Sequence, residues 1–252
     1  MKKKLLFTIL IVSAGLLFFV FSNKVLFTYG NDKPNSKHYE SEKKSETMDE
    51  LISLPKPVYS GEMSVEEALL KRRSVRSYKD YKLSLQQVSQ LLWAAYGISG
   101  ELYGRKLKTA PSAGATYPLE LYLMAGNVDG LTSGLYKYNS EEHSLSLHLK
   151  SDIRSEVASA CHGQKMLQEA PASIIFNAVY SRTTSRYGER GSERYVCMDL
   201  GHSAQNVYLQ ATAMGLATCA IGAFNDSKLK NIIKPVKEEV VLYLMPVGYE
   251  DK

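Results

Sequence analysis

A long helix is predicted by residues 194–215, which read RYVCMDLGHSAQNVYLQATAMG. Apolar side chains recur in this stretch at steps of three and four residues, the spacing that places them on one face of an α-helix. The stripe consists of Val196, Leu200, Ala204, Val207, Ala211 and Met214. We therefore expect a helix that lies centrally in the core, with His202 as a packed histidine that bonds to the backbone.

The segments around this helix read as strands and short helices without a regular β-α-β alternation. Runs of apolar, β-favouring residues occupy residues 119–125, 135–138, 145–149, 172–180, 217–221 and 240–247, and the second and third alternate like a hairpin. A short helix capped by Asp226 is expected between the last two runs. This order indicates an α+β fold and not a doubly wound parallel sheet.

Two further helix starts are marked by capping boxes. Ser64 with Glu67 and Ser84 with Gln87 both have the Ser-x-x-Glu/Gln spacing, in which the two side chains satisfy free amides of a first helical turn. The second of these helices should end at Gly97, where we expect a left-handed residue.

Between these two helices lies the basic segment 71–76, KRRSVR. Guanidinium groups bind phosphate through paired, charge-assisted hydrogen bonds, and a serine hydroxyl can fill one further oxygen site. The segment therefore predicts a phosphate cradle, with a solvated basic turn or a nucleic-acid patch as the alternatives. The net charge of +5 owes much to Lys2, Lys3 and Lys4, and no long basic stripe with interleaved aromatics follows, so nucleic acid is not the expected partner.

The N-terminal region has the layout of a membrane segment and a tether. Three lysines precede the apolar run 5–21, which is nearly long enough to span a bilayer. We expect residues 1–22 to be a retained signal anchor, with cleavage after Ser22 as the alternative. The protein would then lie at the cell membrane with its domain outside the cytoplasm, or be secreted if cleaved. Residues 23–62 are polar and predict a flexible linker, with a possible short helix at 48–54. Residues 63–252 form the expected single domain.

Three cysteines, Cys161, Cys197 and Cys219, are too few and too scattered for an exported disulfide framework. We interpret them as small core residues. Their spacing relative to the five histidines predicts no metal site.

Two segments of small residues are candidates for ligand binding. Residues 110–118, APSAGATYP, enter the first predicted strand, and residues 219–224, CAIGAF, leave a later one. Small side chains let a flat ligand approach the backbone, and free amides can bond to a ring or a phosphate. The alternatives are an ordinary tight loop for the first segment and core packing for the second.

The order of five motifs resembles the flavin-dependent nitroreductase superfamily. These motifs are RRSVR, PSAGATYP, GHSAQN at 201–206, AIGAF and PVGY at 246–249, and the resemblance covers residues 64–249. Within that superfamily, the sequence is similar to the branch of dehydrogenases that oxidise thiazoline and oxazoline rings in modified peptides. The resemblance implies a mostly antiparallel central sheet flanked by helices, and an intertwined homodimer.

The resemblance also implies a noncovalent FMN at the dimer interface. Carried onto this chain, the phosphate and ribityl chain would be held by Arg72, Arg73, Ser74 and Arg76. The isoalloxazine ring would be lined by Ser112, Ala113 and Gly114, with Ile221 and Gly222 near it on the partner side. Asn206 would touch the flavin or cap a buried carbonyl.

Two features depart from the family pattern. The azoline-oxidising branch has a Lys-Tyr pair before the long helix, and here Arg186-Tyr187 stands in its place. Arginine stays protonated and is a poor general base, so Arg186 would orient or bind an anion and Tyr187 is the candidate for proton transfer. Many relatives also continue past the last strand and add a basic phosphate contact. Here either Lys252 serves or the arginines act alone.

The resemblance implies an oxidoreductase that transfers a hydride between the flavin N5 position and a small-molecule or peptide substrate. A dehydrogenase would pass the electrons to an acceptor, whereas an NAD(P)H-dependent reductase would reduce a nitro or quinone compound. A noncatalytic, membrane-tethered flavin-binding protein is a third interpretation.

Overall fold

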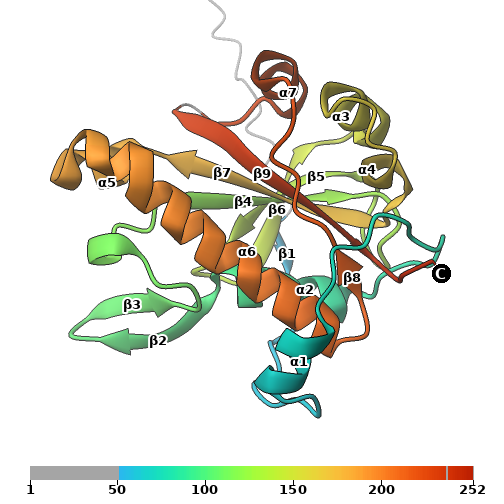
Figure 1. The fold of residues 1–252 in the computed structure, drawn as a ribbon, viewed down its shortest axis with the longest axis horizontal. Helices are drawn as coiled ribbons and strands as arrows, with labels where there is room; N and C mark the ends of the chain where they lie inside the picture. Colours follow the sequence, from blue (N-terminus) through green and yellow to red (C-terminus); the bar gives the residue numbers. More distant parts are fainter. Residues whose placement is uncertain (1–50, 237, 252) are drawn as a thin grey trace, which may run out of the picture. The chain divides into compact units, whose positions relative to one another are not determined.

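The computed structural model describes residues 51–236 and 238–251, and its centre is a seven-stranded sheet (Figure 1). The order of the strands is β1-β6-β5-β4-β7-β9-β8, and every neighbouring pair is antiparallel. The strands are β1 (Leu51–Ser53), β4 (Leu119–Ala125), β5 (Gly134–Asn139), β6 (Ser144–Leu149), β7 (Ala172–Val179), β8 (Ala217–Thr218) and β9 (Glu239–Gly248). The sheet confirms the predicted α+β fold and the antiparallel pairing.

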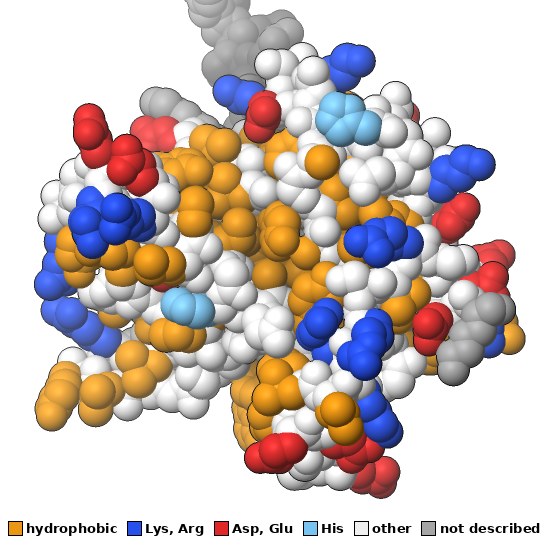
Figure 2. Space-filling view, viewed as in Figure 1, with side chains coloured by type: hydrophobic (Ala, Val, Ile, Leu, Met, Phe, Trp, Pro, Cys, Tyr) orange, Lys and Arg blue, Asp and Glu red, His pale blue; other side chains and the backbone are white. Residues whose placement is uncertain are grey.

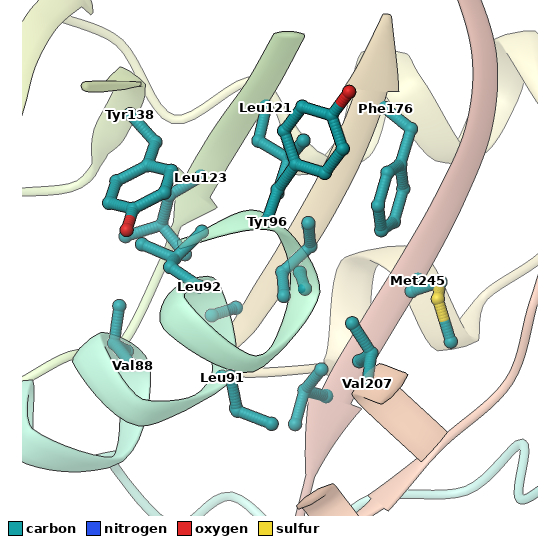
Figure 3. Packing of buried hydrophobic residues seen from close by; sticks show 14 of the residues in the cluster. Val88, Leu91, Leu92, Tyr96, Leu121, Leu123, Tyr138, Phe176, Val207 and Met245 are labelled. Atoms are coloured by element: carbon teal, nitrogen blue, oxygen red, sulfur yellow. The ribbon is translucent and has the colours of Figure 1, made fainter. Parts of the chain in front are cut away.

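Helices cover both faces of the sheet. Along β4, Leu121 and Leu123 join the cluster that packs against α2 (Leu85–Tyr96) and α6 (Val196–Ala213), as Figure 3 shows. Tyr122 and Met124 point to the other face. There they meet side chains of α3 (Arg154–Ala160), α4 (Met166–Glu169) and α7 (Asp226–Ile233). This two-sided burial explains why β4 and β7 read as continuous apolar runs in the sequence.

The two helices with predicted capping boxes begin where the sequence predicts, whereas α7 is capped by Asn225 and not by Asp226. The Ser64 hydroxyl accepts a hydrogen bond from the Glu67 amide at the start of α1 (Val65–Lys71), and Ser84 with Gln87 makes the full capping box of α2. The end of α2 differs from the expectation, because Gly97 is extended (φ −71°, ψ 167°) and not left-handed. A Cβ at Gly97 would lie 2.4 Å from the Trp93 ring, so the glycine is needed for close approach.

The long helix α6 is preceded by a π-helical turn at Gly191–Tyr195 and by α5 (Ser181–Tyr187). Its apolar stripe faces the core, where Val196, Ala204, Val207 and Ala211 are buried. The expectation for His202 is wrong, since this residue lies on the exposed face of the helix. One face of the helix is therefore buried and the other is exposed to solvent. The site residues of this helix that are described below lie beside the buried face.

Residues 51–60, which we expected in the flexible linker, belong to the folded domain. β1 pairs with β6 where the sequence suggested a short helix, and Leu54 is buried. The amide and carbonyl of Val58 bond to the side chain of Gln90 on α2, at 2.8 and 3.0 Å. The attachment left little pattern in the sequence, because Ile52 is the only side chain of the strand that is even partly buried.

The predicted membrane segment at residues 1–22 lies outside the described residues, as does the linker up to residue 50. In the part of the chain that the structure describes, no helix is both long and apolar enough to cross a bilayer. The anchor and its cleavage therefore stay predictions.

The expectation for the cysteines is partly confirmed. Cys161 and Cys219 are buried core residues as expected, but Cys197 is exposed.

The sequence did not reveal the separate hairpin of β2 (Ile98–Leu102) and β3 (Arg105–Lys108). Its polar and charged residues do not alternate with apolar ones as in a half-buried strand. In β2 only the first residue is half-buried, and in β3 only the last two are.

Candidate active site

The structure divides the predicted site residues into two clusters, which lie at opposite ends of α6. The first cluster joins the basic segment to the segment after β8. The Val75 amide donates to the Thr218 carbonyl at 3.0 Å, and Ser74 forms a parallel bridge with Thr218. Arg72–Arg76 and Ile221–Gly222 are therefore neighbours within one chain, although about 150 residues separate them in the sequence.

Tyr208 of α6 holds this first cluster together. Its hydroxyl lies 3.0 Å from the Ser74 hydroxyl and accepts a hydrogen bond from the Ala220 amide at 2.8 Å. Its ring faces the guanidinium of Arg72 at 5.1 Å. No pattern in the sequence marks Tyr208, because it is one tyrosine among 17 and its role depends on two segments that meet only in the fold.

The three arginines of the basic segment are not equivalent. Arg73 turns back to the end of α1 and donates to the carbonyls of Leu70 and Arg72, at 2.9 and 2.8 Å. Arg72 is half-buried and Arg76 is exposed, and neither pairs with a carboxylate among the described residues. Figure 2 shows basic side chains gathered beside α1, next to an apolar surface. Two guanidiniums are thus available to an anion, and the third is engaged with its own helix.

Ile221 and Gly222 contribute differently from one another. The Ile221 side chain is buried, and its amide and carbonyl both bond to Leu244, at 2.8 and 3.0 Å. Gly222 is exposed, and a Cβ there would lie 3.3 Å from the Tyr243 ring. Of these two residues, Gly222 is therefore the one that can contact a ligand, and it would do so through its backbone.

The second cluster is the loop Ser112–Gly114, held by Asp199 at the other end of α6. The Ser112 hydroxyl donates to one carboxylate oxygen of Asp199 at 2.6 Å, and the Ala113 amide donates to the other at 3.3 Å. Asp199 is 2% exposed. Desolvation by burial raises its pKa, and the hydrogen bonds from Ser112 and Ala113 oppose that rise. A buried carboxylate thus fixes the shape of the loop.

Arg186 and Tyr187 lie directly against this loop. The Arg186 guanidinium donates to the Gly114 carbonyl at 3.4 Å. Gly114 has φ +60°, and a Cβ at this position would lie 2.5 Å from the Tyr187 hydroxyl and 2.8 Å from the Arg186 guanidinium. Tyr187 packs edge-on against Tyr195, with ring centroids 4.9 Å apart. The structure therefore brings the two candidate catalytic residues to the candidate ring-binding loop.

Asp199 was also missed, although it left a signal. Asp199, Ser203 and Asn206 repeat at steps of four and three residues beside the apolar stripe of α6, so they share its buried edge. Ser203 donates to the Ala95 carbonyl at 2.6 Å, and Asn206 donates to the carbonyls of Ala94 and Thr109. Of the two roles considered for Asn206, the capping of buried carbonyls is confirmed. A polar line along a helix face next to a core was the available clue.

The profile of the nitroreductase family covers residues 69–249, and the chain belongs to this family. A relative from Methanocaldococcus jannaschii named as a nitroreductase, MJ1384, is 48% identical over 187 residues, which cover 74% of this chain and 91% of the relative.

Two further similarities differ in extent. The trifolitoxin operon protein TfxC of Rhizobium leguminosarum bv. trifolii is 24% identical over 199 residues, which cover 72% of this chain and 54% of TfxC. A crystal structure from Ralstonia eutropha JMP134, described as a nitroreductase, aligns with a TM-score of 0.69 at 28% identity and covers 80% of this chain and 90% of its own. The chain is thus an oxidoreductase of the nitroreductase family.

Proposed function

We propose that the protein is an FMN-dependent oxidoreductase whose phosphate cradle is formed by Arg72, Ser74 and Arg76. The observation that supports this most directly is the pair of guanidiniums without a carboxylate partner among the described residues, next to the Ser74 hydroxyl. A phosphate monoester carries a charge near −2 and has several acceptor oxygens, which suits two guanidiniums and a hydroxyl. Arg73 has a lesser role because its guanidinium bonds to helix carbonyls.

The second cluster fits the flavin ring. Ser112, Ala113 and Gly114 offer small side chains, and Asp199 holds two of these residues in place. When bound, FMN supplies the two-electron chemistry. The chain's own groups bind, orient and exclude water, and the Tyr187 hydroxyl holds or moves the proton that accompanies the hydride. Arg186 keeps its charge and orients an anionic group beside the loop.

A homodimer, which the family resemblance implies, would use both clusters. Asp199 and Tyr208 are nine residues apart on α6, which is about 14 Å along the helix axis. We propose that a second copy brings its Ser112–Gly114 loop to the cradle of the first, so that each flavin lies between two chains. The exposed apolar residues of α1, Val65, Leu69 and Leu70, are available for such a contact.

A dehydrogenase is the favoured direction, with a peptide or small molecule as the substrate. The similarity to TfxC, a protein of the trifolitoxin operon, supports a peptide-modifying branch. The second candidate is an NAD(P)H-dependent nitro or quinone reductase, which the similarity to MJ1384 supports. Arg186 in place of a lysine leaves a noncatalytic flavin-binding role as the rival from another class.

We further propose that residues 1–22 anchor the protein in the cell membrane, with the domain outside the cytoplasm. Three lysines before the apolar run support this orientation. An outward domain would have no access to cytosolic NAD(P)H, so this topology favours a dehydrogenase that uses a quinone or another external acceptor.

The experiment that tests the function is the visible spectrum and released-cofactor mass of the purified full-length protein with added FMN. Flavin bands with one FMN per chain are expected. A colourless protein that binds no added FMN would overturn the proposal. The flavin is then photoreduced without oxygen and mixed with a quinone, a nitro compound or oxygen, which separates the alternatives. If no acceptor reoxidises the flavin faster than buffer alone, the binding-only role is supported.

A further inference from the structure

A cavity of about 520 Å³ lies between the β2–β3 hairpin, the start of β4 and the end of β5. It borders the second cluster, because Thr116 in its wall donates to the Ala113 carbonyl. Its walls include the rings of Tyr96, Tyr117 and Tyr138, which come from α2, the loop before β4, and β5. A volume of this size is in the range of sites that hold small molecules, and three tyrosines suit a flat, partly apolar ligand.

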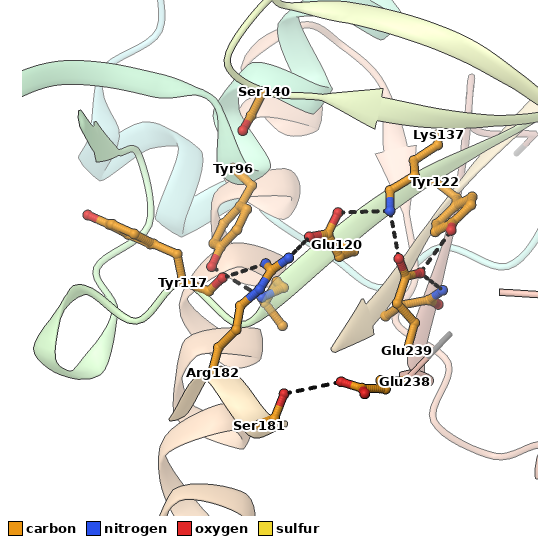
Figure 4. A network of polar contacts seen from close by, with 12 residues as sticks. Tyr96, Tyr117, Glu120, Tyr122, Lys137, Ser140, Ser181, Arg182, Glu238 and Glu239 are labelled. Carbon is orange, nitrogen blue, oxygen red and sulfur yellow. Dashed lines mark hydrogen bonds and ion pairs between the residues drawn. The ribbon is translucent and has the colours of Figure 1, made fainter. Parts of the chain in front are cut away.

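Most of the charged side chains around the cavity are paired with one another (Figure 4). Lys137 bridges Glu120 at 3.2 Å and Glu239 at 2.6 Å, and Arg182 shares Glu120. Arg182 also donates to the Tyr117 carbonyl at 3.1 Å. At the rim, Lys106 pairs with Glu141 at 3.0 Å. These cations are therefore already balanced by carboxylates.

Lys108, the last residue of β3, is the exception. Its ammonium donates to the Ser140 hydroxyl at 2.5 Å and to the Tyr96 carbonyl at 3.5 Å, and it forms no ion pair with a carboxylate among the described residues. It lies 4.2 Å from the centroid of the Tyr96 ring and 5.9 Å from that of Tyr117. A half-buried ammonium that faces a cavity and has only neutral partners is well placed to bind an anion.

We propose that this cavity is a binding site for a small aromatic carboxylate, with Lys108 and Ser140 as the carboxylate contacts and the tyrosine rings around the apolar body. A carboxylate is preferred to a phosphate because a single unpaired ammonium matches one negative charge. The cavity contains none of the residues of the arginine cradle, so the proposal does not depend on the phosphate assignment.

The electrostatics of Lys108 agree with this geometry and give the site a pH dependence. Desolvation by burial lowers the pKa of Lys108 to about 8, with nearby Arg182 acting in the same direction and Glu120 and Glu141 opposing it. The rings of Tyr96 and Tyr117 and the hydroxyl of Ser140 face the ammonium. An anion stabilises the protonated form, so affinity for a carboxylate should change little between about pH 5 and pH 7 and fall about tenfold per pH unit well above pH 8.

The test is isothermal titration calorimetry of the purified full-length protein with sodium benzoate, and with benzamide as the neutral probe of the same shape. We expect millimolar binding of benzoate at pH 7, at least tenfold weaker binding of benzamide, and at least tenfold loss in Lys108→Met. Lys106→Met, which removes a rim cation already paired with Glu141, should bind benzoate as the wild type does.

Several outcomes would overturn the proposal. These are no benzoate binding at tens of millimolar, equal binding of benzamide, or undiminished binding in Lys108→Met. Thermal unfolding of Lys108→Met shows whether that variant is folded. If it is not, the pH profile of the wild type decides, because benzoate affinity that is unchanged between pH 7 and pH 10 contradicts a role for the ammonium.

Discussion

The two ends of α6 differ in the charge of the side chain that binds the neighbouring segment. At the Asp199 end, a buried carboxylate accepts from Ser112 and Ala113 and fixes the loop from inside. At the Tyr208 end, a neutral hydroxyl joins Ser74 to Ala220, and the neighbouring Arg72 has no carboxylate partner among the described residues. The Tyr208 hydroxyl carries no charge that could pair with the arginines, so they remain available to an anion. A carboxylate in the same place would form ion pairs with them. The Tyr208 end is therefore the one that suits an anion.

The largest effect should come from placing a carboxylate at the neutral end. Ser74→Asp would pair with Arg72 or Arg76 and repel the phosphate, so we expect FMN affinity to fall a hundredfold or more, on the order of 3 kcal/mol. Ser74→Asn, which keeps the size without the charge, is the matched control and should lose about tenfold. Quenching of flavin fluorescence measures both values. Equal losses in the two variants would show that charge at this position is irrelevant.

The second prediction separates the three arginines. Arg72→Ala and Arg76→Ala should each weaken FMN binding about tenfold to a hundredfold, because each removes a charged hydrogen-bond donor worth about 1.5–3 kcal/mol. Arg73→Ala should have a smaller effect, since Arg73 donates to the carbonyls of Leu70 and Arg72. The same fluorescence titration compares all three. If Arg73→Ala proves the most damaging, the cradle assignment of Arg72 and Arg76 is wrong.

The third prediction concerns the loop at the carboxylate end. Gly114→Ala would bring a Cβ to 2.5 Å from the Tyr187 hydroxyl, at a residue with φ +60°. We expect a stability loss of about 1–2 kcal/mol and displacement of Tyr187, with a clear fall in turnover. Gly104→Ala is the matched control, because Gly104 also has positive φ (+72°) but its Cβ would meet nothing within 4 Å.

Thermal unfolding and flavin reoxidation rates measure the two parts of this third effect. Gly104→Ala should show only the backbone cost, about 1 kcal/mol, with turnover intact. Identical behaviour of the two variants would mean that Tyr187 does not need the space above Gly114.

The smallest effect is the pH dependence of Asp199. Burial raises its pKa in the folded protein above the unfolded value of about 3.9, so folding favours the protonated form. Its contribution to stability is complete below the unfolded pKa and is lost as pH rises through the folded pKa. The stability deficit of Asp199→Asn relative to the wild type should therefore shrink between pH 4 and pH 7. Melting temperatures of both proteins across this range test the sign, and a deficit that grows with pH contradicts it.

Local patterns were read well from the sequence where one physical cause acts alone. The strand at Leu119–Ala125 has the predicted bounds, because both of its faces are buried and its apolar run is continuous. The helix start at Ser84 is also as predicted, since its capping box closes within four residues. Gly97 shows the limit of such reasoning. A glycine after a helix suggested a left-handed cap, but the real constraint is the Trp93 ring, which no local pattern reveals.

The site was predictable in its parts and not in its assembly. The motifs named the basic segment and the loop, but the roles of Tyr208 and Asp199 depend on contacts across more than 80 residues of sequence. The Lys108 cavity left no motif at all, since it forms where a hairpin, a loop and two strands meet.

From the sequence alone follow the long helix, the central strands, the α+β class and the charge of the basic segment, because periodicity, capping and side-chain charge are local properties. Only the tertiary structure decided which cations have carboxylate partners. Arg182 pairs with Glu120, and Lys137 pairs with Glu120 and Glu239, whereas Arg72, Arg76 and Lys108 form no ion pair among the described residues. Electrostatic energy depends on distance in space and on burial, and neither is written in the order of residues along the chain.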